Sequence, residues 1–236
     1  MDSASKPLKT LTLASLLLLA VATGLVLFYA PREAVMGEVQ RVFYFHVAAG
    51  WVGMLSFLVA AVAGGMYLAR PRARLDEVAV SSVEIGVIFT LINIVSGSIW
   101  ARPAWNTWWT WDPRLVTASV MELIYFAYLM LRSGIDDPER RARLGAVYTI
   151  VGFLSVPLTF FSIRFFRTLH PVVIGSSNPA AVGGFDMTPR MLQVFLFSLL
   201  TFSLLYISLL WHRVRLERLT RKVEEAKGQR MAGGAA

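Results

Sequence analysis

Residues 78–100 read VAVSSVEIGVIFTLINIVSGSIW, residues 101–114 read ARPAWNTWWTWDPR, and residues 115–131 read LVTASVMELIYFAYLML. The first and third stretches are almost uncharged and are long enough to cross a bilayer core as helices, which takes about 20 residues. The middle stretch is polar and aromatic, so it connects the two spans at one membrane surface. This pattern predicts an all-α, polytopic membrane protein.

Four further apolar segments of spanning length lie on either side, at residues 11–29, 43–69, 144–166 and 191–211. The first follows two lysines, as a signal peptide would. Its apolar run is longer than a typical signal core and ends without a small-residue cleavage site, so we expect a retained span. The sequence therefore predicts six transmembrane helices in a single membrane domain, residues 1–236.

Composition supports this class and excludes several others. The chain is 56% hydrophobic and 16% charged, which is too apolar for a soluble domain of 236 residues. It contains no cysteine, so disulfides, iron–sulfur ligation and thiol chemistry within the chain are excluded. The net charge of +8 resembles a nucleic-acid signal. The charges lie at the ends of apolar runs, however, where they orient a membrane protein, and no nucleic-acid partner is expected.

The distribution of basic residues predicts the orientation. The N-terminus, the second and fourth connections and the C-terminus together hold 16 of the 23 Lys and Arg residues. The positive-inside rule then places both termini in the cytoplasm and the Trp-rich loop between the third and fourth spans outside, with residues 30–42 and 167–190. Residues 213–236 form a basic cytoplasmic tail, expected to be a helical anchor at anionic lipid.

Five of the seven tryptophans fall within twelve residues, at Trp100, Trp105, Trp108, Trp109 and Trp111. Such a group forms either an interfacial belt or a platform for a large planar ligand. A belt spreads its aromatic residues over many helix ends, so the concentration favours a platform. If the segment is helical, the second, third and fourth of these tryptophans share a face and the fifth is turned aside.

Two histidines lie on the same predicted outer side. His46 begins the second span, and helical spacing places Ala49, Gly50 and Gly53 below it. Small residues at this spacing also allow two membrane helices to approach closely, so both interpretations stay open. His170 follows the fifth span, and Pro171 keeps it out of the preceding helix. The third histidine, His212, is expected at the cytoplasmic interface.

Asp112 and Pro113 are predicted to be the N-cap and the first residue of the fourth span's helix. Taken with the histidines and tryptophans, the basic residues at the same level indicate haem, whose iron takes axial imidazoles, whose ring packs on aromatic faces and whose carboxylates bind arginine. These basic residues are Arg41, Arg102, Arg114, Arg164 and Arg167. Two alternatives remain: a membrane b-type haem electron-transfer subunit and a haem-free permease subunit of an ABC exporter.

Three strings carry a family resemblance: QRVFYFHV at residues 40–47, WNTWWTWDPRL at residues 105–115 and FFRTLHP at residues 165–171. Together with six spans in 236 residues they resemble the WWD-motif haem-handling family, in its CcmC form, from system I cytochrome c maturation. The resemblance covers roughly residues 40–193. The chain departs from the usual motif at Asn106, Pro113 and Val116. Asn106 tolerates left-handed backbone and Pro113 suits a first helical position, so the loop geometry is expected to survive.

The resemblance implies specific roles. His46 and His170 would be the external axial ligands of haem b, and the motif residues Trp105, Trp108, Trp109, Trp111 and Asp112 would hold the macrocycle. The family passes haem to the chaperone CcmE in the bacterial inner membrane, beside CcmA and CcmB, an ABC-type pair, and the small subunit CcmD. ATP use belongs to CcmA, and no phosphate-binding G-x-x-x-x-G-K-[ST] occurs in this chain.

The expected task is presentation of haem with a vinyl edge left open, so no catalytic residue is assigned and the chain is not expected to be an enzyme. Polar residues inside the predicted spans, Glu84, Asn93 and Glu122, have two open interpretations. Ionisable and polar groups in a membrane often mark function, and they also form hydrogen-bonded helix contacts.

Overall fold

The structure is a computed structural model of the whole chain, and residues 5–33, 36–171 and 187–233 are described here. It is built from helices. The first span consists of α1 (Lys6–Gly24) and a π-helical turn η1 (Leu25–Tyr29), and a 3-10 turn η2 (Glu38–Arg41) precedes the second. The remaining elements are α2 (Val42–Ala69), α3 (Ala73–Trp105), α4 (Pro113–Ser133), α5 (Pro138–Phe153), α6 (Ser155–Phe165) and α7 (Pro189–Gly233).

Six helical segments are long and apolar enough to cross a membrane, which confirms the predicted spans. Most helices begin or end a few residues beyond the predicted bounds, and two differences bear on the arrangement of the cavity end. Helix α3 was expected to end near Trp100 but continues through Pro103 to Trp105. The fifth span is interrupted at Leu154, where α5 ends and α6 begins. Pro157, in the first turn of α6, has no N–H to continue the hydrogen-bond ladder of α5, which accounts for the interruption.

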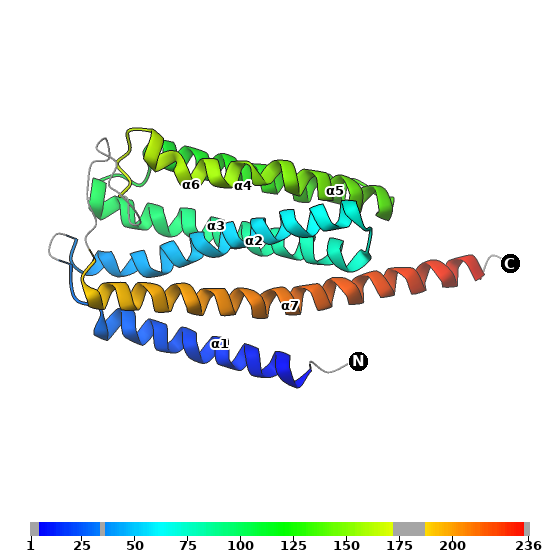
Figure 1. Cartoon of the computed structure of the whole chain (residues 1–236), viewed down its shortest axis with the longest axis horizontal. Coiled ribbons are helices and arrows are strands. Elements are labelled where there is room, and N and C mark those ends of the chain that lie inside the picture. The colour runs from blue at the N-terminus through cyan, green and yellow to red at the C-terminus, as the bar shows by residue number, and fades with distance from the viewer. Residues whose placement is uncertain (1–4, 34–35, 172–186, 234–236) are drawn as a thin grey trace.

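The helices form three groups that lie side by side (Figure 1). The α2–α3 hairpin is central, α7 and α1 cover one side of it, and α4 with α5 and α6 covers the other. Both chain termini lie at the same end of the bundle, as an even number of spans requires. We call this end the terminal end, and the opposite end, which carries the Trp-rich loop, the cavity end.

Small residues bring α2 and α3 into close contact. A Cβ atom added to Gly53 of α2 would lie 2.5 Å from Oγ1 of Thr90, and one added to Gly86 of α3 would lie 2.5 Å from the ring of Phe57. The Phe57 ring in turn stacks on Tyr125 of α4 with ring centres 3.5 Å apart. Gly53 therefore serves the close contact between α2 and α3, as the helix-contact interpretation expects. The tightly packed hairpin forms a rigid support for the residues at the cavity end.

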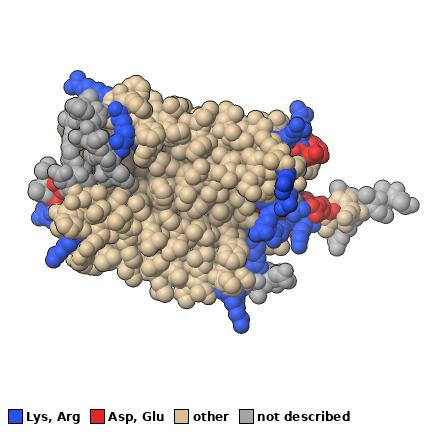
Figure 2. Space-filling model, viewed as in Figure 1, with Lys and Arg blue, Asp and Glu red and all other residues tan. Residues whose placement is uncertain are grey.

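Charged residues gather at the two ends of the molecule, and a broad uncharged band separates them (Figure 2). Many large apolar side chains in this band are exposed, including Leu17, Val62 and Leu158. An exposed apolar surface of this extent suits contact with lipid rather than water. The position of the band agrees with the six predicted spans.

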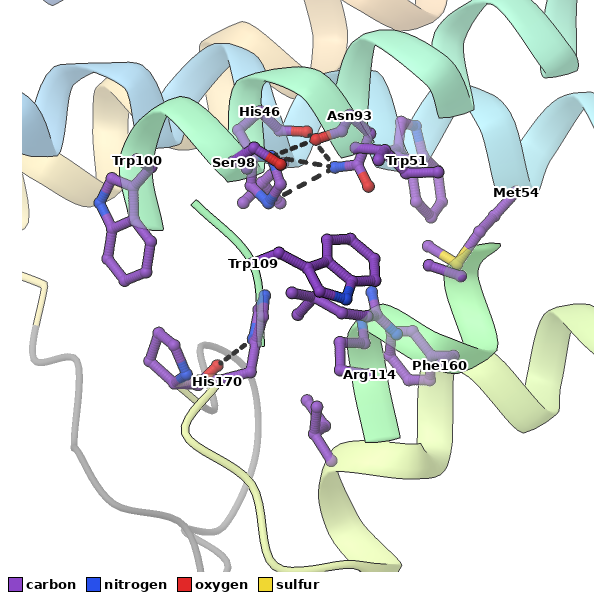
Figure 3. A pocket seen from close by; sticks show the side chains of 18 of the residues that line it. His46, Trp51, Met54, Asn93, Ser98, Trp100, Trp109, Arg114, Phe160 and His170 are labelled. Atoms are coloured by element: carbon purple, nitrogen blue, oxygen red, sulfur yellow. Dashed lines mark hydrogen bonds between the residues drawn. The ribbon is translucent and has the colours of Figure 1, made fainter. Parts of the chain in front are cut away.

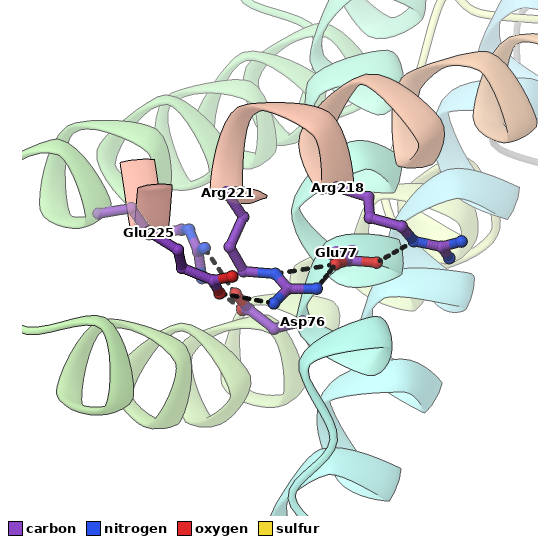
Figure 4. A network of polar contacts seen from close by, with 6 residues as sticks. Asp76, Glu77, Arg218, Arg221 and Glu225 are labelled. Carbon is purple, nitrogen blue, oxygen red and sulfur yellow. Dashed lines mark hydrogen bonds and ion pairs between the residues drawn. The ribbon is translucent and has the colours of Figure 1, made fainter. Parts of the chain in front are cut away.

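At the terminal end, α7 is joined to the rest of the bundle by ion pairs (Figure 4). Glu77 of α3 is only 3% exposed and pairs with Arg221 at 2.8 Å and with Arg218 at 3.4 Å. One heptad further along α3, Glu84 pairs with Arg213. These contacts fix the half of α7 that lies farthest from the cavity end.

Candidate functional site

A cavity of about 230 Å³ opens at the cavity end, between the α2–α3 hairpin and the α4–α6 pair (Figure 3). Its wall combines two histidines, three tryptophans of the cluster and two arginines with apolar side chains. The residues that line it include His46, Gly50, Trp51, Met54, Asn93, Gly97, Trp100, Trp105, Trp109, Arg114, Leu115, Ala118, Phe160, Arg164, His170, Pro171, Phe195 and Leu199.

His46 is held in the first turns of α2 by α3. Its Nδ1 lies 3.0 Å from the carbonyl oxygen of Asn93 and 3.2 Å from Oγ of Ser96. The Asn93 side chain in turn donates to the carbonyl oxygen of His46 at 2.8 Å. Because the Asn93 carbonyl can only accept, this network assigns the ring proton to Nδ1. The lone pair is then on Nε2, which the side-chain amide of Asn93 approaches at 3.5 Å.

Two glycines make room for this arrangement. A Cβ atom added to Gly97 would lie 2.9 Å from Cε1 of His46, and one added to Gly50 would lie 2.8 Å from Nδ2 of Asn93. A real Cβ would therefore displace either the imidazole or the amide that holds it. The glycines at these two positions are required by the packing of the histidine rather than by backbone torsion.

His170 comes from the opposite side of the cavity, in the loop that follows α6. Helix α6 ends at Phe165, so the expectation that His170 lies outside the preceding helix is confirmed. Its Nδ1 lies 3.2 Å from the carbonyl oxygen of Pro171. Burial, with smaller contributions from the Arg114 and His46 charges, lowers the pKa of His170 to about 3. The imidazole is thus neutral at physiological pH, as a metal ligand must be.

The two imidazoles face each other across the cavity. Their ring centres are 6.5 Å apart and their planes differ by 37°. A bond between a metal and an imidazole nitrogen is about 2 Å long, and the ring centre lies about 1 Å behind that nitrogen. Two imidazoles on opposite sides of one metal ion therefore have ring centres about 6 Å apart. The observed distance of 6.5 Å between the ring centres is close to this value.

The tryptophans divide into a cavity group and an exposed group. Trp100 and Trp105 pack edge to face with ring centres 5.2 Å apart and line the cavity, as does Trp109. Trp108 is 59% exposed and Trp111 is 84% exposed. The helix ends at Trp105 because Asn106 adopts the left-handed conformation, so the condition for a shared helical face of Trp105, Trp108 and Trp109 is not met.

Asp112 caps α4, as predicted, by accepting a hydrogen bond from the backbone N–H of Arg114 at 2.9 Å, and Pro113 is the first helical residue. Asp112 does not line the cavity, although the resemblance assigns the whole motif to the macrocycle. Its carboxylate instead binds the loop that carries His170, through Thr168 and Leu169.

The five predicted arginines also differ in position, and only some of them line the cavity. Arg114 and Arg164 line the cavity, and the Arg114 guanidinium donates to the carbonyl oxygen of Thr159 on α6. Arg41 pairs with Glu38 at 2.9 Å, and Arg102 donates to the carbonyl oxygen of Asn106 at 2.7 Å. Neither of these two lines the cavity, and Arg167 does not line it either.

The three polar residues inside spans have different surroundings. Asn93 belongs to the cavity through His46, whereas Glu84 forms an ion pair with Arg213 far from it. Glu122 of α4 is 4% exposed, and neither carboxylate oxygen has a hydrogen-bond partner among the described residues. His212, expected at an interface, is hydrogen-bonded to Thr12 of α1 at 2.8 Å.

Sequence reasoning did not assign several cavity residues, among them Trp51, Met54, Gly97 and Phe160. Gly97 stands four residues after Asn93, so one face of α3 carries both, and this spacing was a usable signal. The apolar side chains gave no such signal, because lipid-facing and cavity-facing residues have the same composition in a membrane helix.

Comparison with known proteins gives consistent matches over most of the chain. The profile of the family described as heme exporter protein C (CcmC) matches residues 1–229. Heme exporter protein C of Bradyrhizobium diazoefficiens is 33% identical over 199 residues, which cover 82% of this chain and 72% of that protein. Heme exporter protein C of Paracoccus denitrificans is 31% identical over 207 residues, 85% of this chain and 83% of that protein.

A similar match comes from a plant. A putative cytochrome c biosynthesis ccmC-like mitochondrial protein of Marchantia polymorpha is 29% identical over 153 residues, which cover 65% of this chain and 64% of that protein.

Proposed function

Because the chain belongs to the heme exporter protein C (CcmC) family, we propose that it binds haem b between His46 and His170 and presents it to the haem chaperone CcmE. Family membership gives the chain a role in haem handling during cytochrome c maturation, as a multi-pass membrane protein. The single observation that carries the finer proposal is the facing pair of imidazoles, with ring centres 6.5 Å apart.

The chemistry of the cavity suits haem. Both histidines turn Nδ1 to a backbone carbonyl, so the Nε2 atoms would be the ones to hold the iron. Trp100, Trp105 and Trp109 offer flat apolar surfaces to the macrocycle. Each feature taken singly has other uses, and the histidines, the tryptophans and the two cavity arginines together match the needs of an iron porphyrin.

Arg114 and Arg164 are the candidates for the haem propionates. Both line the cavity, and a guanidinium forms a two-pronged contact with a carboxylate. Arg41 and Arg102 do not line the cavity and are weaker candidates. When haem is bound, its iron and vinyl groups supply the reactive chemistry. The residues of this chain bind it, orient it and limit its contact with water.

The family name also supports assembly into a haem exporter complex with other Ccm subunits. We propose CcmA, CcmB and CcmD as these subunits and the bacterial inner membrane as the location. A haem-free permease subunit would leave the facing imidazoles without a use. An electron-transfer subunit would typically hold haem between histidines deep in facing spans, whereas His170 here lies in a loop beyond α6.

The proposal is tested by the absorption spectrum of the purified protein. We expect a low-spin b-type spectrum, which His46→Ala and His170→Ala should each abolish or shift to a five-coordinate form. His212→Ala is the matched control, because His212 contacts α1 rather than the cavity. An unchanged Soret band in both cavity variants would refute axial ligation by these histidines.

The external position of the cavity is tested separately by thiol labelling. The chain has no cysteine, so a single cysteine at Asn106 reports the cavity end and one at Asp136 reports the terminal end. We expect an impermeant reagent added to intact cells to label the first and not the second. The reverse pattern would place the cavity in the cytoplasm. Ser177, in the predicted third external connection, lies outside the described residues.

A further inference from the structure

The Asp112 carboxylate joins two segments that are far apart in the sequence. It is 5% exposed, and Oδ1 accepts the capping bond from the Arg114 N–H. Its oxygens also accept from the Thr168 hydroxyl at 2.8 and 2.9 Å, and Oδ2 accepts from the Leu169 N–H at 2.7 Å. One side chain therefore starts α4 and binds the loop that follows α6.

The connection continues to His170. The Thr168 hydroxyl oxygen, which belongs to a residue only 2% exposed, accepts from the backbone N–H of His170 at 3.0 Å. The Asp112 carboxylate, the Thr168 hydroxyl and the His170 amide thus form a continuous chain of hydrogen bonds. Because the carboxylate is charged, its bonds are stronger than those between neutral groups.

Helix capping alone does not require this arrangement. Ser, Thr or Asn caps a helix about as well as Asp with a single acceptor atom. At position 112 both oxygens of the side chain accept, which an amide cannot reproduce because it has one oxygen and a donor NH₂ group. A second Asp-Pro pair in the chain makes the contrast clear. Asp137 caps α5 through the Arg140 N–H at 2.6 Å and is exposed.

We propose that Asp112 is a positioning residue for His170, which holds the loop so that the imidazole faces His46 across the cavity. Asp112 does not line the cavity, so it would act on a bound ligand through the loop rather than by contact. This inference rests on the proposed role of His170 as an axial ligand. Under this inference, Asp112 of the Trp-rich motif positions a ligand of the iron, and the tryptophans that line the cavity contact the haem ring.

The first test compares Asp112→Asn with Asp137→Asn, a matched change at a cap that binds no second segment. We expect Asp112→Asn to lower haem occupancy about 10- to 100-fold, as the loss of a group that orients a metal ligand typically does. The haem that remains should be partly high-spin, and added imidazole should restore the low-spin spectrum. Asp137→Asn should leave both unchanged.

A second pair of variants tests whether the Thr168 hydroxyl transmits the effect of Asp112 to His170. Thr168→Val removes the hydroxyl that joins Asp112 to His170, and Thr168→Ser keeps it. We expect the valine variant to reproduce the spectral change of Asp112→Asn and the serine variant to retain the wild-type spectrum. Wild-type spectra in both Thr168→Val and Asp112→Asn would overturn the inference. A change in Asp112→Asn alone would assign the positioning to the bond between Asp112 and the Leu169 N–H, which the valine variant keeps.

A third measurement needs no haem. In the ligand-free protein the amides of Leu169 and His170 should exchange with deuterium at least tenfold faster in Asp112→Asn, with little change in the middle of α4. Slow exchange in that variant would refute the positioning role even if His46 and His170 ligate haem. If instead the histidine variants retain a wild-type spectrum, the proposed function fails and the exchange result still reports on the loop.

Discussion

The ion-paired residues of the terminal end differ from the charged residues beside the cavity, although the cavity end also holds the pair of Arg41 and Glu38. At the terminal end, carboxylates and arginines neutralise each other: Glu77 binds two arginines of α7, and Asp76 binds Arg132 through two short contacts of 2.6 and 2.9 Å. At the cavity end, Arg114 faces the cavity and forms no ion pair with a carboxylate of the described chain. The nearby Asp112 carboxylate accepts hydrogen bonds from the Thr168 hydroxyl and the Leu169 N–H.

Under the proposed function, this difference separates groups that stabilise the fold from groups that bind a ligand. A paired carboxylate and guanidinium need nothing further, and removing one of them leaves the other charge without a partner. A cation and two imidazoles around an apolar cavity are the groups that would bind the anionic, metal-containing ligand of the proposed function. Changes at the cavity end should therefore alter haem binding more than stability, and changes at the terminal end should do the reverse.

The largest effect is expected from Gly97→Ala. The new Cβ would lie 2.9 Å from Cε1 of His46 and would displace the imidazole, so haem affinity should fall about 10- to 100-fold. Gly65→Ala is the matched control in α2, because a Cβ there meets no atom within 4 Å. Haem titration of the purified variants measures both. Equal affinities would show that the cavity tolerates a displaced His46.

A smaller effect is expected from replacing one tryptophan that lines the cavity. Trp109→Phe removes indole surface from the wall and should cost ~1 to 2 kcal/mol of haem binding, which is about 5- to 30-fold in affinity. Trp108→Phe changes a residue that is 59% exposed and should change affinity less than twofold. Haem attached to CcmE in cells, at matched expression, gives the functional measurement. Equal losses in the two variants would favour a lipid belt.

At the terminal end, Glu77→Gln should change stability and leave haem binding intact. Glu77 is buried, but its two arginine partners are more than 40% exposed, so we expect a loss of about 1 to 2 kcal/mol in the free energy of unfolding rather than the full cost of a buried pair. Thermal unfolding in detergent measures it, with Glu225→Gln as an exposed control. A change in the Soret band would contradict the separation of the two ends.

The smallest effect is expected from pH. The lowered pKa of His170, about 3, means that its neutral form persists as the pH falls and that the lone pair is lost to a proton only in strong acid. Haem affinity should change less than twofold between pH 8 and pH 5.5. A histidine with the ordinary value near 6.5 would be about 90% protonated at the lower pH and would lose about tenfold. Such a loss, centred near pH 6.5, would show that His170 is exposed to water.

The fold could be predicted from sequence to a large extent because the hydrocarbon core sets the length of each span. Six apolar runs gave six helices, and the Asp112 and Pro113 pair marked the start of α4. The same rule could not locate the interruption at Leu154. A hydropathy pattern is averaged over the whole span, so it does not detect a break in the helix that one residue, Pro157, causes.

The candidate site was only partly predictable. Placing His46 and His170 on the same surface needed only the count of spans and the distribution of basic residues. The contacts that orient them are long-range: Asn93 lies 47 residues from His46, and Leu169 lies 57 residues from Asp112. No local pattern encodes such pairs, since they depend on how three helix groups pack. The resemblance identified the motif, and only the structure separated Trp109 from Trp108 and Asp112 from the ring site.

The depth of the cavity limits which atoms of a ligand can react. Its lining follows α2 from His46 to Met54, eight residues or about 12 Å of helix, which compares with about 30 Å for the thickness of a bilayer core. A planar ligand held in this cavity would have its inner edge enclosed by apolar side chains such as Met54 and its outer edge near the opening. The protein would then shield one part of the ligand from reaction, as a protecting group does in chemical synthesis. Substituents at the inner edge are masked, and those at the rim are left for the next molecule to reach.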